Sequence, residues 1–133
     1  MDYLTNRLKR AIKKGGMIIT PRRSGKTQAI LDLLSDSDEY VLICYSKSYA
    51  LHIRQELSER SQWSLNQIAK MIIGSRDRYD KSKKIILDEF FWNPAFFGDI
   101  GYHCAISSNR EDLILYNKTG RRMKIAQNEV WNG

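Results

Sequence analysis

The sequence predicts an α/β fold with a mainly parallel central sheet that ends in an antiparallel hairpin. Three observations support this prediction. Residues 16–59 follow the order strand, loop, helix, strand, helix, which is typical of a βαβ unit. Residues 40–45 are almost continuously apolar, as expected for a parallel strand that is covered on both faces. Only about six residues separate the strand at 102–106 from the next apolar run, too few for a helical crossover, so the last strands should be antiparallel.

The chain begins with a predicted amphipathic helix at residues 3–14, which Gly15 and Gly16 end. Its apolar face consists of Leu4, Leu8, Ala11 and Ile12, and its other positions include Arg7, Lys9, Arg10, Lys13 and Lys14. The basic residues predict either contact with nucleic acid or a solvated face, and the pattern does not favour one over the other.

A strand at 16–20 and a helix at 26–35 follow, with a turn at 35–38. The helix should turn its apolar residues Ala29, Ile30, Leu33 and Leu34 toward the sheet.

The middle of the chain predicts a strand at 40–45 and a helix at 47–59 that buries Ala50, Ile53 and Leu57. A shorter helix is expected at 64–72, with Ser64 and Gln67 as a capping box. Residues 71–73 fit the end of this helix or a short strand equally well. A charged loop at 74–83 leads to the strand at 84–89, and its basic residues are a second candidate for nucleic-acid contact or another solvated loop.

The last third of the chain is rich in aromatic residues. Phe90, Phe91, Trp92, Phe96 and Phe97 follow the strand at 84–89, and most of them should pack under a helix or loop, although an exposed Trp92 could stack on a base or on another subunit. A strand is predicted at 102–106. Two further strands, 113–116 and 122–125, should form a hairpin around 117–120. The sequence does not indicate what Trp131 in the tail contacts.

The segment from residue 17 to residue 27 reads as a strand, a phosphate-binding loop and the first turn of a helix. The template is Gly, four residues, Gly-Lys and then Ser or Thr. Gly25, Lys26 and Thr27 match it, whereas Thr20 replaces the first Gly. Backbone N–H groups at the start of a helix still bind an anion. Lys26 would meet the β- and γ-phosphates, and Thr27 would offer a hydroxyl to Mg²⁺.

A second chemical signal is the strand at 84–89, which ends in Asp88 and Glu89. Ligands of parallel sheets lie beyond the carboxyl ends of the strands, so both carboxylates should share an edge with the phosphate-binding loop. Asp88 would hold the shell of Mg²⁺, and Glu89 would activate a water. Ser107, Ser108 and Asn109 follow the next strand and could sense the γ-phosphate, although a turn or cap explains them equally well.

Composition indicates a protein that favours polyanionic partners, because the net charge is +7. We expect Cys44 and Cys104 to be buried, reduced thiols of a cytoplasmic protein, without a disulfide or a bound metal. His52 and His103 are expected to be structural. No apolar run approaches about 18 residues, so no membrane span is predicted.

With both motifs in place, the chain resembles P-loop NTPases that carry a Glu beside the strand-end Asp, and most closely the ATPase domain of viral and phage terminase large subunits, with helicase-like ATPases next. Four stretches carry the resemblance: residues 21–27, 40–46, 74–76 and 85–89. It implies a three-layer sandwich in one compact domain, with a basic helix at 1–15, a nucleotide-binding core at 16–110, and a hairpin and tail at 111–133.

The resemblance also implies ATP and Mg²⁺ as ligands and hydrolysis coupled to DNA movement. It implies Glu89, Lys26 and Arg22 as catalytic residues, with Arg22 stabilising charge on the transferred phosphoryl group, and Thr27 and Asp88 at the metal. Nucleotide would be bound by Pro21, Arg22, Arg23, Ser24, Gly25, Lys26, Thr27 and Gln28. The implied partners are double-stranded DNA, further copies of the chain, and motor or portal proteins in the host cytoplasm.

Several features depart from a full packaging motor. The chain has no room for a nuclease domain, no clear adenine-reading Gln segment before the loop, and none of the later strands and helices. Alternatives are therefore a nucleotide-binding regulatory protein with weak or no hydrolysis, and a small-molecule kinase, which the neighbouring Glu89 disfavours. Asn117-Lys118-Thr119 is similar to a guanine-reading motif, but Gly120 stands where an Asp is needed, so a turn is preferred over a GTPase.

Overall fold

The computed structural model describes residues 3–22, 24–74, 78–108, 113–117 and 121–123. Within these residues, the helices are α1 (Tyr3–Lys14), α2 (Lys26–Asp36), α3 (Lys47–Arg60), α4 (Leu65–Met71), the 3₁₀ turn η1 (Phe90–Trp92) and α5 (Pro94–Phe97). The strands are β1 (Gly16–Thr20), β2 (Tyr40–Ile43), β3 (Ile72–Ile73), β4 (Lys84–Asp88), β5 (Cys104–Ser108), β6 (Ile114–Tyr116) and β7 (Arg122–Met123).

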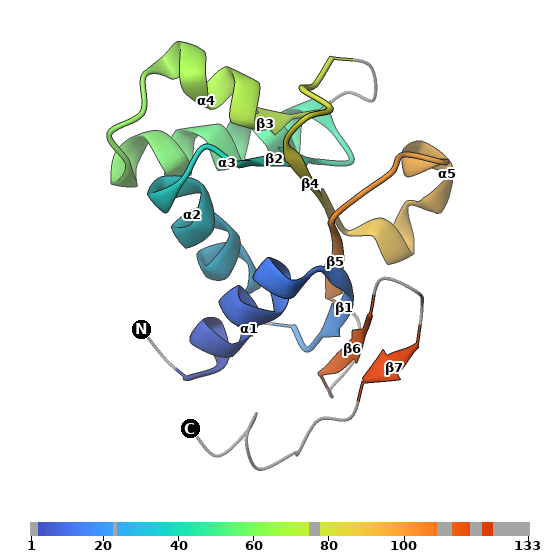
Figure 1. Ribbon diagram of the computed structural model, residues 1–133. Helices are drawn as coiled ribbons and strands as arrows, with labels where there is room; N and C mark the ends of the chain where they lie inside the picture. The colour runs from blue at the N-terminus through green and yellow to red at the C-terminus, as the bar shows by residue number, and fades with distance from the viewer. Residues whose placement is uncertain (1–2, 23, 75–77, 109–112, 118–120, 124–133) are drawn as a thin grey trace.

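The described strands form one mixed sheet in the order β3-β2-β4-β5-β1-β6-β7 (Figure 1). Strands β3, β2, β4, β5 and β1 are mutually parallel, whereas β6 pairs antiparallel with β1 and β7 pairs antiparallel with β6. The predicted α/β class with a mainly parallel sheet and an antiparallel end is therefore confirmed. The order also shows that β5 lies between the strand before the predicted phosphate-binding loop and the strand that ends in Asp88.

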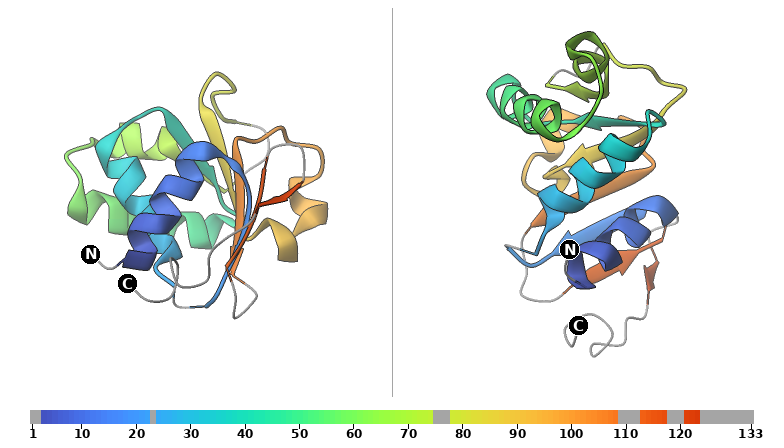
Figure 2. Two further views of the ribbon diagram at one scale, coloured as in Figure 1. Left: turned by 60° about the horizontal axis from the view of Figure 1, so that its bottom comes forward. Right: turned by 90° about the vertical axis from the view of Figure 1, so that its left-hand side faces the viewer.

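Both faces of the sheet are covered, as the apolar run of β2 predicts. Tyr40 and Leu42 join one buried cluster with residues of α1 to α4, whereas Val41 and Ile43 join a second cluster with Phe97. Successive strand residues point to opposite faces, so this alternation places a core on each side. Figure 2 shows α1 to α4 on one side of the sheet and the short α5 segment on the other.

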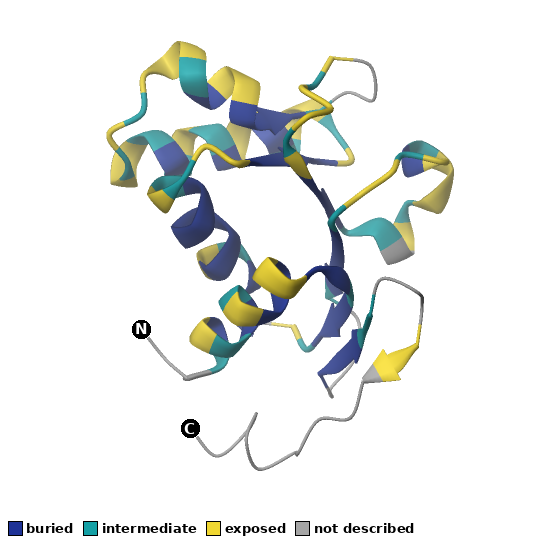
Figure 3. Cartoon of the chain, in the orientation of Figure 1, coloured by how far each residue is buried: buried dark blue, intermediate teal, exposed yellow. Residues whose placement is uncertain are grey.

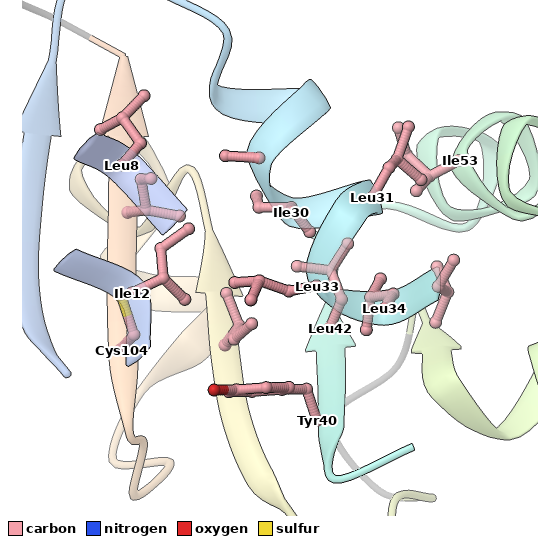
Figure 4. Packing of buried hydrophobic residues seen from close by; sticks show 14 of the residues in the cluster. Leu8, Ile12, Ile30, Leu31, Leu33, Leu34, Tyr40, Leu42, Ile53 and Cys104 are labelled. Atoms are coloured by element: carbon pink, nitrogen blue, oxygen red, sulfur yellow. The ribbon is translucent and has the colours of Figure 1, made fainter. Parts of the chain in front are cut away.

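Helix α2 is the most deeply buried helix because it lies between α1 and α3 (Figure 3). Its apolar residues meet Leu8 and Ile12 of α1, Leu42 of β2 and Ile53 of α3 in one cluster (Figure 4). Asp32 is 8% exposed and links the three helices through polar contacts. Arg60 of α3 lies 2.7 Å from its Oδ1, and Lys9 of α1 lies 3.9 Å from its Oδ2.

The predicted helices α1 and α3 are confirmed, as is Ser64 as the cap of α4, where its Oγ accepts from the Gln67 N–H at 3.1 Å. Residues 71–73 resolve into both proposed structures. Helix α4 ends at Met71, and Ile72 and Ile73 pair with β2. His103 is structural, because its Nε2 lies 2.9 Å from the carbonyl oxygen of Ile12 near the end of α1.

Several predicted boundaries are wrong, including that of the strand expected at 84–89, which ends at Asp88. The turn expected at 35–38 begins later, because the helix continues to Asp36 and the Ser37 N–H still bonds to Leu33 O. The strand expected at 40–45 ends at Ile43, since residue 46 already caps α3. The strand expected at 102–106 lies at 104–108, because its register with β1 starts at Cys104 opposite Gly16.

Cys44 and Cys104 are buried free thiols, as predicted. Among the described residues, no helix is both long and apolar enough to cross a lipid bilayer. The tail with Trp131, and the second hairpin strand beyond Met123, lie outside the described residues.

Candidate functional site

The candidate site lies where three parallel strands end side by side. Strand β5 pairs with β1 on one side and with β4 on the other, all in the same direction. The carboxyl ends of β1, β5 and β4 therefore share one edge of the sheet, which is where ligands of parallel sheets bind. The loop at 20–26 leaves this edge from β1, Ser107 and Ser108 end β5, and Asp88 ends β4.

Lys26 joins the loop to the acidic strand. Its Nζ donates to Asp88 Oδ1 and to Glu89 Oε1, each at 2.5 Å. The side chains of Lys26 and Asp88 are 9% and 2% exposed, and that of Glu89 is 18% exposed. Burial alone would lower the pKa of Lys26, but the charges and hydrogen bonds of the two carboxylates outweigh it and raise this pKa above its ordinary value. Lys26 is therefore a cation throughout the physiological pH range.

Glu89 is held in an unusual backbone conformation. Its φ is 60°, and it is the one non-glycine residue with positive φ in the described part of the chain. Such a conformation costs of order 1 kcal/mol or more and persists only where neighbours impose it. Here the Glu89 N–H donates to Ile106 O at 2.7 Å, and its carbonyl accepts from Asn93 Nδ2 at 3.0 Å. The Ser108 N–H donates to Glu89 Oε1 at 3.2 Å.

The loop after β1 explains the Thr20 mismatch. Thr20 donates its hydroxyl to Ser24 Oγ at 2.8 Å, and both residues are buried, so this bond ties the two ends of the loop together. Gly25 has φ of 87°, and a Cβ at this position would lie 2.2 Å from Thr5 Oγ1 of α1. Glycine is therefore required at position 25 both by its conformation and by the close approach of α1.

Two residues that were not predicted as site residues, Tyr49 and Cys44, lie beside the site. The Tyr49 hydroxyl of α3 is close enough to Thr27 and Asp88 for both side chains to affect its pKa. Burial, and then the charge of Asp88, raise the pKa of Tyr49. Cys44 at the end of β2 is also close enough for Asp88 and Lys26 to act on it, and burial is the main cause that raises its pKa. Both residues follow β2, the strand that pairs with β4.

The remaining predicted residues have different environments. Arg22 is exposed in the loop and Pro21 is partly exposed. The Gln28 side chain hydrogen-bonds with Asp32 at 3.1 Å and with Arg60 at 3.1 Å, so its amide is engaged on the α3 side of α2. Arg23, residues 75–77 and Asn109 lie outside the described residues.

Two basic regions border the fold. Arg7, Arg10 and Lys14 of α1 line a cavity of about 210 Å³ between this helix and β6, together with Leu115 and Tyr116. A second cavity of about 380 Å³ beside β3 is lined by apolar residues and by Lys47, Arg54 and Arg78.

The segment that is similar to a guanine-reading motif forms part of the hairpin. Asn117 Oδ1 accepts from the Arg121 N–H at 2.8 Å, which is typical of a turn.

The oxygen ligands of the site suit a hard cation only in part. The Thr27 hydroxyl and the Asp88 carboxylate are the donor types that Mg²⁺ prefers. However, among the described residues no group of three or more His, Cys, Asp or Glu side chains could hold a metal ion. Mg²⁺ at this edge would thus need phosphate oxygens and water to complete its coordination.

No protein-family model, curated protein or solved structure matches this chain. The functional argument therefore depends on the geometry of the site. Tyr49 was missed as a site residue because its neighbours Thr27 and Asp88 are distant from it in the sequence. The signal that could have found Tyr49 is its place in the first turn of the helix after β2, a strand expected beside the acidic strand.

Proposed function

We propose that this protein binds and hydrolyses ATP in a magnesium-dependent reaction and acts on or with double-stranded DNA, as the terminase-type packaging ATPases that it resembles do. The observation that carries the proposal is the meeting of Lys26, Asp88 and Glu89 at one sheet edge, directly beside the loop. Lys26 lies 62 positions before Asp88 and 63 before Glu89 in the sequence. The sequence motifs predict one shared reaction for all three residues.

The residues support hydrolysis rather than binding alone. The backbone N–H groups of the loop and Lys26 would hold the phosphates, because a helix N-terminus and a cation both attract anions. Glu89 would accept a proton from a water as that water attacks the γ-phosphorus, while the bond from phosphorus to the leaving ADP oxygen breaks. The exposed Arg22 would stabilise charge on the transferred group.

Thr27 and Asp88 are the residues that would hold Mg²⁺, and the Tyr49 hydroxyl lies close to both. Mg²⁺ would supply positive charge that neutralises the phosphate oxygens. The three-layer P-loop arrangement that the resemblance implies is part of the same proposal.

Nucleic acid is the proposed partner because the net charge is +7 and because two cavities carry three cations each. The acidic residues of the chain are absent from the described lining of both cavities. Such surfaces favour phosphate backbones, and the affinity should fall with salt. Assembly of several copies, or with motor and portal proteins, remains part of the proposal on the resemblance alone.

The deciding experiment is phosphate release from ATP with and without double-stranded DNA. Lys26→Ala should abolish nucleotide binding or turnover, and Glu89→Gln should retain binding and lose hydrolysis. Arg121→Ala, an exposed change in the hairpin, serves as a control that should leave both intact. The enzyme reading fails if purified protein releases no phosphate under either condition, and GTP preferred over ATP would reopen the GTPase alternative.

A second candidate is a nucleotide-binding regulatory protein with little hydrolysis. The observation in its favour is that Lys26 already contacts both carboxylates, so these groups must separate before Lys26 can meet a phosphate. Tight ATP binding without turnover, even with DNA, would favour this candidate. Turnover that rises steeply with DNA would favour the first.

A further inference from the structure

Trp92 combines a fixed polar contact with an exposed ring. It lies in η1, three positions after Glu89, and is 53% exposed. Its indole Nε1 donates to the carbonyl oxygen of Ser108 at 3.0 Å. An exposed tryptophan that only covers apolar surface needs no such bond, so this contact orients the indole relative to the end of β5.

The same Ser108 also contacts the proposed catalytic carboxylate. Its N–H donates to Glu89 Oε1 at 3.2 Å, while its carbonyl accepts from Trp92. The backbone of Ser108 therefore connects the Trp92 indole to the Glu89 carboxylate. Glu89 and Trp92 are also joined by the short chain segment between them, so these contacts form a closed ring. Next to this segment, Asn93 Nδ2 donates to Glu89 O at 3.0 Å.

Glu89, the residue with positive φ, is part of this ring of contacts. A residue with φ of 60° needs contacts that impose the conformation. The contact from Trp92 to Ser108 and that from Ser108 to Glu89 hold η1 against β5 on both sides of the turn. Glu89 is also held by its own N–H bond to Ile106 O and by Lys26. Loss of the indole bond would therefore loosen η1 beside β5 and shift the Glu89 carboxylate without releasing the turn.

We propose that Trp92 is a positioning residue for Glu89, which it orients through the backbone of Ser108. The kinetic part of this inference rests on the proposed function. The residue acts mainly on turnover, because its indole bond to Ser108 leads to the acidic turn that carries Glu89.

Trp92→Phe keeps an aromatic ring and removes the indole N–H. We expect kcat for ATP to fall about threefold to tenfold, the effect of one lost neutral hydrogen bond, with nucleotide affinity unchanged. Trp63→Phe is the matched control. Its Nε1 donates to Leu34 O at 2.7 Å, at the end of α2 away from Lys26, so the same chemical change should leave kcat unaltered.

A second measurement needs no turnover. In a Trp63→Phe/Trp131→Phe background, Trp92 is the remaining tryptophan of the chain. Glu89→Ala should shift its emission to longer wavelength and increase its quenching by acrylamide, whereas Glu39→Ala, an exposed acid at the start of β2, should do neither. Emission that does not respond to Glu89→Ala overturns the inference.

The two measurements separate two failures. If the wild-type protein releases no phosphate, the proposed function fails, and the fluorescence result alone decides whether Trp92 and Glu89 are linked. If Trp92→Phe weakens nucleotide binding as much as it lowers kcat, or if Trp63→Phe lowers kcat equally, positioning is refuted in favour of a general loss of stability.

Discussion

Removing the positive charge of Lys26 should destabilise the fold even in the absence of nucleotide. Lys26 is surrounded by two carboxylates, of which Asp88 is 1% exposed. Lys26→Met keeps an unbranched side chain of similar length but leaves two neighbouring negative charges at the end of β4. We expect the free energy of unfolding at pH 7 to fall by about 3 kcal/mol, near the lower end of the range for breaking a buried ion pair.

The magnitude follows from the geometry of the two contacts. At 2.5 Å, each contact has a gross Coulomb attraction of about 6–7 kcal/mol for an effective dielectric constant of about 20. Desolvation of the buried ammonium and carboxylate offsets most of this attraction. Lys26→Met loses the attraction but still buries the charge of Asp88. The fall in unfolding free energy therefore exceeds the net contribution of the intact triad to stability.

Urea unfolding followed by far-ultraviolet circular dichroism measures this change. Lys84→Met is the matched control, because Lys84 lies 3.8 Å from Glu39 and both side chains are about half exposed, so the loss should stay below about 1 kcal/mol. Adding Asp88→Asn to Lys26→Met should restore part of the stability. Equal stability of wild type and Lys26→Met, within about 0.5 kcal/mol, would refute the buried triad.

The effect should also depend on pH. The pKa of Lys26 is raised on folding, so the native state keeps its proton more tightly than the unfolded chain does. The resulting stability is fully present below the unfolded value of 10.5 and is lost as pH rises toward the folded value. The difference between wild type and Lys26→Met should therefore shrink above that pH, and a difference that grows there would contradict the assignment.

Three further predictions concern the surroundings of the triad. Gly25→Ala should lower the unfolding free energy by more than about 1 kcal/mol, because φ is 87° and the new Cβ would meet Thr5 Oγ1; equal urea midpoints would contradict this. Glu89→Gly should be more stable than Glu89→Ala by about 1 kcal/mol in the same assay, since both lose the carboxylate but only glycine tolerates φ of 60° without strain. Cys44 and Cys104 should resist alkylation at pH 8 until urea unfolds the protein, because burial raises both thiol pKa values, that of Cys104 to about 12; rapid labelling of folded protein would show that the thiols are accessible.

The fold could largely be predicted because its signals are local. The helix at 3–14, the strand at 16–20 and the helix at 47–59 each carry their apolar period and their end signals within the segment itself. The antiparallel end of the sheet followed from a connection too short for a crossover. The wrong boundaries include one that a neighbouring strand determines, as at β5, whose pairing with β1 starts at Cys104 opposite Gly16.

The core of the candidate site was also accessible from sequence, because Lys26, Asp88 and Glu89 each end or follow an apolar strand. Its remaining parts were not. The contacts of Thr5 with the loop and of Trp92 with Ser108 depend on which elements are neighbours in space. Strand spacing alone does not reveal that β5 lies between β1 and β4, and this order is what brings Ser108 to Glu89.

Under the proposed function, the pairing of Lys26 with both carboxylates would make nucleotide binding depend on a metal ion. An incoming triphosphate competes with Asp88 and Glu89 for the same ammonium, and the three anionic groups repel one another. If Lys26 moves to the phosphates, Asp88 is left as a buried charge without a cation, which is costly. Under the proposed function, Asp88 and Thr27 would hold a divalent ion that arrives with the nucleotide, and its positive charge would remove that cost. Glu89, which is more exposed than Asp88, would then be free to contact water.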